Sequence, residues 1–71
     1  MAGGSVTATC TGSAITATYA VTAGFHLDPS SKLGGSDIDV RFRADSSGAE
    51  SRVRADCIGG AVHEIEASNK N

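Results

Sequence analysis

Apolar side chains in this sequence recur at every second position in four separate segments, and this period constrains the fold more than any other feature. At residues 37–44, DIDVRFRA, isoleucine, valine, phenylalanine and alanine alternate with aspartate and arginine. The same alternation occurs at residues 6–10, 14–23 and 51–57. Since successive side chains of a strand point to opposite faces, each segment predicts a strand with one buried and one solvent-exposed face. We therefore expect an all-β antiparallel domain.

Turn signals between these segments predict how the strands pair. Gly12 and Ser13 form a two-residue hairpin turn of the glycine-first type, which places Cys10 opposite Ile15. Residues 45–48, DSSG, predict a four-residue turn in which the glycine adopts a positive φ. Both turns keep the apolar residues of adjacent strands on the same face.

A third turn, at the glycine pair that follows Ile58, can be built in two ways. A plain two-residue turn would direct Glu64 and Glu66 toward the core. A bulged three-residue loop over residues 59–61 would instead direct three other side chains inward: His63, Ile65 and Ala67. Because burial of unpaired carboxylates is costly, we predict the bulged loop.

The long connection at residues 24–36 predicts one short helical turn. Asp28 can cap it, a proline follows at the first helical position, and Gly34 can end it. We expect the apolar residues of this connection to fold over an open end of the core. In the alternative interpretation, Phe25 and Leu33 contact a partner instead, because long loops on small scaffolds often carry function.

The length of 71 residues predicts a single β-domain over residues 1–71, ordered roughly from residue 4 to residue 67 with frayed ends. We expect about five strands, arranged as a small antiparallel sandwich or a partly open barrel. The chain lies near the lower size limit for a stable core and contains no tryptophan. A covalent or metal cross-link is therefore expected.

Cys10 and Cys57 are the natural cross-link. A disulfide between them would close a loop of roughly 48 residues and contribute about 4 kcal/mol in the chain-entropy description of the unfolded state. Two buried free thiols are one alternative. A zinc site that includes His26 and His63 is another, but structural zinc ligands usually come in closely spaced pairs, which this sequence lacks. We predict the disulfide, and with it an oxidising, extracytoplasmic location.

All four arginines fall on the polar face of two neighbouring predicted strands: Arg41, Arg43, Arg52 and Arg54. The predicted register sets Glu50 opposite one of them and Asp39 opposite another. Cross-strand pairs of opposite charge are a common stabilising use of such residues on an exposed sheet face. The alternative is that adjacent guanidinium groups bind an anionic ligand or a cell-wall polymer.

Several functional classes are not expected. A formal net charge of -2, with the few aromatic residues in the core or the long loop, argues against nucleic-acid binding. No apolar run is long enough for direct membrane insertion. Cys57 could approach His63, and His26 lies near Asp28, but neither arrangement completes a catalytic set. We predict no enzymatic activity, no cofactor and no metal site.

The first residues lack the basic start and apolar run of a secretory signal. The simplest interpretation is an excised or mature domain of an exported protein.

Three sequence stretches resemble a known group of domains: GSVTATCTG near the start, AGF followed by an alternating VRF in the middle, and RVRADCIGGAVHEI near the end. Together they resemble small β-domains in the extracytoplasmic portions of actinobacterial cell-envelope proteins, over roughly residues 4–67. The resemblance implies a similar placement of the two cysteines, a β architecture and a location outside the cytoplasm, with no reaction attached. One departure is the segment at residues 21–25, VTAGF, which lacks the proline of the P-A-x-G-[FY] element in those domains.

These observations predict a non-enzymatic extracytoplasmic interaction or sensing module within a larger exported or membrane-anchored protein. Its partner would be a protein or an anionic component of the cell envelope. The alternative is a small binding domain that recognises an anionic ligand or wall polymer through the four arginines. The sequence does not specify the oligomeric state.

Overall fold

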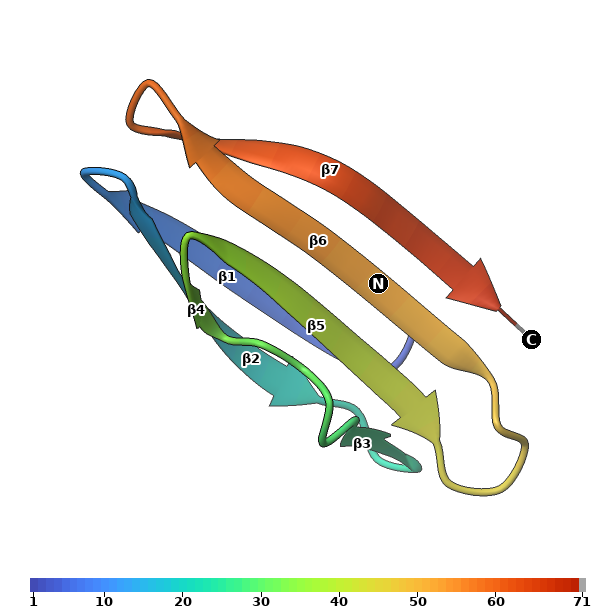
Figure 1. Cartoon of the computed structure of the whole chain (residues 1–71). Helices are drawn as coiled ribbons and strands as arrows, with labels where there is room; N and C mark the ends of the chain where they lie inside the picture. Colours follow the sequence, from blue (N-terminus) through green and yellow to red (C-terminus); the bar gives the residue numbers. More distant parts are fainter. Residues whose placement is uncertain (71) are drawn as a thin grey trace.

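A computed structural model describes the backbone of residues 1–70 and the side chains of residues 1–69, and it contains seven strands (Figure 1). In chain order the strands are β1 (Gly4–Thr11), β2 (Ala14–Val21), β3 (Phe25–Leu27), β4 (Gly34–Gly35), β5 (Asp37–Ala44), β6 (Glu50–Ile58) and β7 (Ala61–Lys70). They form two antiparallel sheets, with strand orders β1-β2-β4 and β3-β5-β6-β7. The predicted all-β antiparallel class is confirmed. The predicted number of five strands is wrong, because the long connection contributes two further short strands, β3 and β4.

The predicted helical turn within residues 24–36 is also wrong. Asp28 does cap a turn, since its Oδ1 accepts hydrogen bonds from the N–H and the hydroxyl of Ser30, at 2.8 and 2.7 Å. The turn does not continue, because Lys32 then pairs with Asp39 through two backbone hydrogen bonds of 2.7 and 2.8 Å. The chain thus returns to an extended conformation after one aspartate–proline turn.

The first two long hairpins have the predicted registers. Cys10 lies opposite Ile15 in the β1–β2 hairpin, and Arg43 lies opposite Glu50 in the β5–β6 hairpin. Gly48 adopts the positive φ that the second turn requires, at 72°. Local turn chemistry and apolar alternation agree at both hairpins, and their agreement makes the registers predictable.

The third hairpin differs from the prediction. Its two glycines form a plain two-residue turn, with Ile58 opposite Ala61. The bulge lies further along the strands, where the register shifts so that Arg54 pairs with Glu66 and Ile65 is the extra residue. The pairing of Arg54 with Glu66 is as predicted, although the bulge that produces it is displaced from the turn.

The displaced bulge changes which side chains of β7 face inward. His63 and Ile65, which the sequence predicted to face inward, are exposed, and His63 lies opposite Asp56. Glu64 lies opposite the buried Ala55 instead. A carboxylate at such a position is tolerated because the inner face of β7 is not covered by the other sheet.

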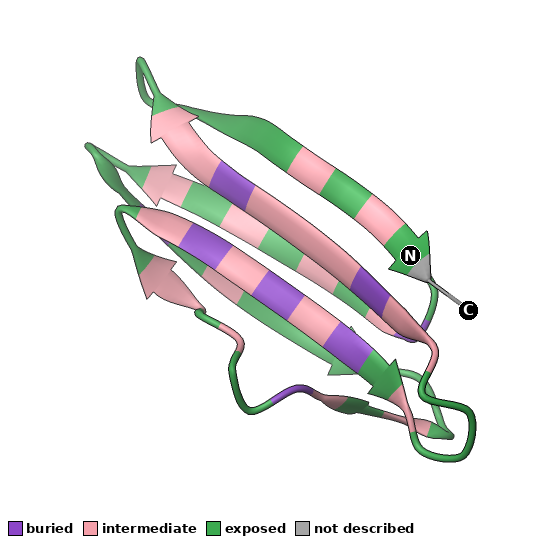
Figure 2. Cartoon of the chain, turned by 45° about the vertical axis from the view of Figure 1, so that its right-hand side comes forward, coloured by how far each residue is buried: buried purple, intermediate pink, exposed green. Residues whose placement is uncertain are grey.

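The core occupies the space between the two sheets. Its buried apolar side chains come from β2, β5 and β6 (Figure 2): Ile15, Ile38, Val40, Phe42 and Ala55. Tyr19 on β2 lies opposite Val6, with its ring centroid 6.2 Å from that of Phe42, and is 43% exposed. The predicted disulfide is confirmed: it joins Cys10 on β1 to Cys57 on β6, with the two Cα atoms 5.9 Å apart.

The two sheets differ in width. β2 packs across β5 and β6, while β1 lies at the edge of its sheet and approaches β7 only in part. Figures 1 and 2 show β7 projecting past the edge that β1 forms. The three-stranded sheet is therefore one strand too narrow to cover the four-stranded sheet.

Candidate functional site

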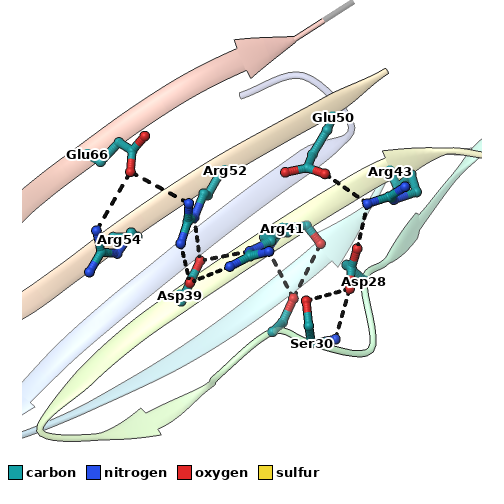
Figure 3. Close-up of polar contacts among 10 residues, drawn as sticks. Asp28, Ser30, Asp39, Arg41, Arg43, Glu50, Arg52, Arg54 and Glu66 are labelled. Atoms are coloured by element: carbon teal, nitrogen blue, oxygen red, sulfur yellow. Dashed lines mark hydrogen bonds and ion pairs between the residues drawn. The ribbon is translucent and has the colours of Figure 1, made fainter. Parts of the chain in front are cut away.

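The arginine face consists of Arg41, Arg43, Arg52 and Arg54, which project from β5 and β6 (Figure 3). Asp39 lies at its centre. Arg52 donates to the two carboxylate oxygens of Asp39 from Nε and Nη2, at 2.9 and 2.7 Å. Arg41 donates to the same oxygens from the same two nitrogens, at 3.3 and 3.0 Å. One carboxylate thus binds two guanidinium groups, each in the two-point geometry that arginine forms with carboxylates.

These contacts perturb the protonation equilibria of all three groups. Hydrogen bonds from Arg52 and, to a smaller extent, from Arg41 hold the pKa of Asp39 well below its ordinary value of 3.8, although partial burial acts in the opposite direction. Hydrogen bonding to Asp39 raises the pKa of Arg41 and that of Arg52. All three groups are therefore charged at neutral pH.

Arg43 binds a second pair of carboxylates. Its Nη2 lies 3.1 Å from Oδ2 of Asp28 and 3.0 Å from Oε2 of Glu50. Asp28 is buried, and its pKa is lowered first by the hydrogen bond from the Ser30 hydroxyl and also by Arg43. The turn after β3 is thereby tied to the C-terminal end of β5.

The last arginine, Arg54, is the most loosely held. Its Nη1 lies 3.8 Å from Oε1 of Glu66, and the same oxygen lies 3.9 Å from Arg52. The four arginines thus face four carboxylates, those of Asp28, Asp39, Glu50 and Glu66. An external anion would have to compete with these carboxylates for the guanidinium groups.

The residues considered for catalysis do not form a common site. Cys57 is bonded to Cys10. His63 lies 3.0 Å from Asp56 on the polar face of β6 and β7, and His26 lies 2.6 Å from Asp45 beside the β5–β6 turn. Within residues 1–69, no three metal-ligating side chains come together.

Phe25 and Leu33, the candidate contact residues of the long connection, are half-buried and pack against the core cluster. Phe25 begins β3 and Leu33 directly precedes β4, and both side chains lie in the position expected for residues that close the end of the core.

The sequence did not predict a groove between the two sheets along β1 and β7, which we call the β1–β7 groove. It has a volume of about 490 Å³. Met1 lines it at one end, and the rest of its apolar lining comes from Val6, Ala8, Ile38, Val53, Ala55, Val62 and Ala67. Val62 is 46% exposed although it lies on the inner face of β7, opposite Cys57. The alternation in β7 indicated that one face of this strand is apolar. Whether that face is covered or left open as a groove depends on which strands of the two sheets overlap.

Glu64 is the acidic side chain of the β1–β7 groove. It lies opposite Ala55 and is exposed, and it forms no ion pair with the described side chains. Arg52 also lines the groove, but its guanidinium group donates to Asp39. A largely apolar groove with the carboxylate of Glu64 beside it is suited to a ligand that combines apolar groups with one positive charge.

The fold and these surfaces define a small disulfide-linked domain of two facing antiparallel sheets. No protein-family model, curated protein or solved structure matches the chain. None of the described residues belongs to a helix of the length and hydropathy needed to cross a membrane.

Proposed function

We propose that this chain is a non-enzymatic interaction or sensing module of the extracytoplasmic space, belonging to a larger exported or membrane-anchored protein. The observation that carries the proposal is the β1–β7 groove, in which apolar side chains such as Val62 remain accessible on the inner face of a sheet. Exposed apolar surface with a polar rim is typical of interaction sites.

Two observations support the location. The disulfide between Cys10 and Cys57 is stable in oxidising compartments and rare in the cytosol. The resemblance to extracytoplasmic domains of actinobacterial envelope proteins points to the same compartment. The resemblance favours a cell-envelope protein as the partner, and the disulfide is compatible with that compartment.

Site-directed photo-crosslinking tests the proposal. A photoreactive residue is placed at Val62 in the groove, at Arg54 on the arginine face, or at Thr18 on the exposed outer face of β2. We expect the variant at Val62 to form specific adducts with the envelope fraction of the producing organism, while the Thr18 variant serves as the background. Adducts no more abundant than this background at every position would contradict an interaction role.

The second candidate is recognition of an anionic ligand by the arginine face, favoured by the partial exposure of Arg43 and by the loose pairing of Arg54. We expect Arg54→Glu to leave the fold intact, because its ion pair is long and exposed. If the face binds acidic polymers, this variant loses binding to a wall polymer such as teichoic acid in a pull-down. Unchanged binding would leave the face with a structural role only.

A further inference from the structure

The edge of β1 that borders the groove has unpaired backbone groups. Thr22 donates its N–H to the carbonyl oxygen of Gly3 at 2.8 Å, which makes this a hydrogen-bonded pair at the start of the β1–β2 ladder. Hydrogen-bonded and non-hydrogen-bonded pairs alternate in an antiparallel ladder. The odd-numbered residues of β1 therefore direct their N–H and C=O groups toward β2. The even-numbered residues direct their N–H and C=O groups to the other edge. Those of Gly4 already bond to Met1, at 3.2 and 3.1 Å, so the free positions are Val6, Ala8 and Cys10.

The two free edges beside the groove differ in how they resist further pairing. β1 reads GSVTATCT and has no charge, no proline and no bulge. β7 carries His63, Glu64 and Glu66 and is distorted by the bulge at Ile65. Charges and bulges are the usual protection of an edge strand, so β1 is the edge that can accept another strand.

A strand added to β1 would fill the groove. It would widen the three-stranded sheet to four strands and lie over the inner face of β7, which projects past β1 (Figure 1). The apolar side chains that it would cover include Val62 and Val53. Pairing would therefore combine backbone hydrogen bonds with burial of apolar surface, as in known cases of strand addition.

The position of Glu64 specifies the central side chain of the added strand. β1 and β6 run in the same direction and are joined at Cys10 and Cys57. Two residues before this bridge, Ala8 is level with Ala55, which pairs with Glu64. A residue opposite Ala8 on the added strand would point toward this carboxylate, and a basic side chain there would neutralise it.

We propose that the β1–β7 groove accepts an extended segment of a partner protein. The segment pairs antiparallel to β1 and carries lysine or arginine opposite Ala8, with apolar residues two positions before and after it. This inference rests on the proposed function as an interaction module and specifies its ligand.

The first test measures binding of the peptide T-V-T-K-T-V-T, labelled and held between short polar flanks, to the full 71-residue chain by fluorescence anisotropy. We expect the matched peptide with glutamate in place of lysine to bind about tenfold more weakly. The charge-reversed variant Glu64→Lys should invert this preference. Glu66→Lys, on the opposite face of the same strand, should retain it.

The second test addresses backbone pairing. Ala8→Pro removes one free-edge N–H that makes no bond within the domain, so this variant should keep its melting temperature and lose peptide binding by at least about tenfold. Hydrogen exchange on the wild-type protein gives the same information without substitution. Added peptide should slow exchange at the amides of Val6, Ala8 and Cys10, and leave those of β7 unchanged.

Three results would overturn the inference: equal affinity for the lysine and glutamate peptides, protection of β7 instead of β1, or a dimer in which β1 pairs with β1 of a second copy. If the peptides fail while the crosslinker at Val62 still captures a partner specifically, only the inferred ligand is wrong. If crosslinking fails at every position as well, the proposed function fails with it.

Discussion

At the residue scale, Asp39 is the side chain on which the arginine face depends. Four hydrogen bonds from Arg41 and Arg52 converge on it, and its side chain is only 16% exposed. Without its charge, two partly buried guanidinium groups would be left close together. Like charges at that distance repel, and their lost hydrogen bonds are not fully replaced by water.

We therefore expect Asp39→Asn to lower the free energy of unfolding by about 2 kcal/mol at pH 7, measured by urea denaturation. The matched control is Glu66→Gln, whose contacts of 3.8 and 3.9 Å should cost less than about 0.5 kcal/mol. Equal losses in the two variants would show that Asp39 does not anchor the network.

The contribution of Asp39 to the free energy of unfolding should also depend on pH. The pKa of Asp39 is lower in the folded chain than its ordinary value of 3.8, so the unfolded chain binds more protons in acid. The contribution of Asp39 to stability is complete above that ordinary value and is lost as the pH falls through the folded pKa. The difference in unfolding free energy between wild type and Asp39→Asn should therefore shrink steadily as the pH is lowered below about 4. A difference that stays constant to the lowest pH at which the chain folds would contradict this assignment.

Gly3 shows how closely the N-terminal segment packs. It is buried with a φ of 88°, and an added Cβ would lie 2.7 Å from Cδ2 of Phe25 and 2.8 Å from Cβ of Phe42. Gly24 has the same φ of 88° with open space around it. Alanine substitutions at Gly3 and Gly24 therefore separate the cost of backbone strain, which both share, from the cost of steric overlap, which only Gly3 has.

We expect Gly24→Ala to cost about 1–2 kcal/mol from the left-handed backbone alone. Gly3→Ala should cost about 1–3 kcal/mol more, because the methyl group overlaps two phenylalanine rings or their stems. Thermal melts of the two variants measure the difference. Equal losses would mean that the N-terminal segment moves away from Phe42 at little cost.

At the element scale, the connection between β2 and β5 is part of the core boundary. Its two short strands pair with β5 and β2, and Leu33 accepts a backbone hydrogen bond of 2.8 Å from Ala17 while its side chain packs against the core cluster. The connection therefore holds the two sheets together at the edge opposite the groove.

We expect Leu33→Ser to lower stability by about 2 kcal/mol, since a half-buried leucine loses its packing and a hydroxyl takes its place. Ile58→Ser, at a position that is 58% exposed, is the control and should change stability by less than about 0.5 kcal/mol. Unchanged stability in Leu33→Ser, together with lost partner binding, would favour the alternative that this side chain is a contact residue.

The bulge in the β6–β7 hairpin is the element that shapes the groove. It returns Glu66 to the polar face beside Arg54 while Glu64 stays on the inner face. Without the extra residue, the two glutamates would share one face, because side chains two positions apart in a regular strand do so. The bulge thus brings the carboxylate of Glu66 beside Arg54 and leaves that of Glu64 beside the groove.

At the scale of the whole molecule, the disulfide is the main link between the sheets at the groove edge. It joins residues 47 positions apart and connects β1, the edge strand of one sheet, to β6 of the other. Among the residues that the structure describes, only five form the buried apolar core, so the cross-link carries a large share of the stability.

Replacement of both cysteines by alanine should therefore lower the free energy of unfolding by about 4 kcal/mol in the chain-entropy description. Melting curves of the oxidised protein, the reduced protein and the double variant give the comparison, with mass spectrometry to verify the state of the thiols. A melt that does not change on reduction would exclude the disulfide as the stabilising element.

The alternation of apolar residues and the glycine turns allowed the strand segments, two hairpin registers and the disulfide to be predicted from the sequence alone. These features follow from local geometry: a period of two fixes the inward face, and a short turn fixes which residues are opposite. Cys10 and Cys57 share the inward face of their strands, so their bridge follows from the same pattern. The pairing of Arg43 with Glu50 was predictable from the same hairpin register.

Only the tertiary structure decided the position of the bulge, the return to an extended chain between β3 and β4 in place of the expected helical turn, and the exposure of the inner face of β7. Each depends on lateral contacts between segments far apart in the chain: Lys32 with Asp39 in one case, and β1 with β7 in another. The penalty for an inward Glu64 depends on whether the opposite sheet covers it, and the number of strands in that sheet is not a local property.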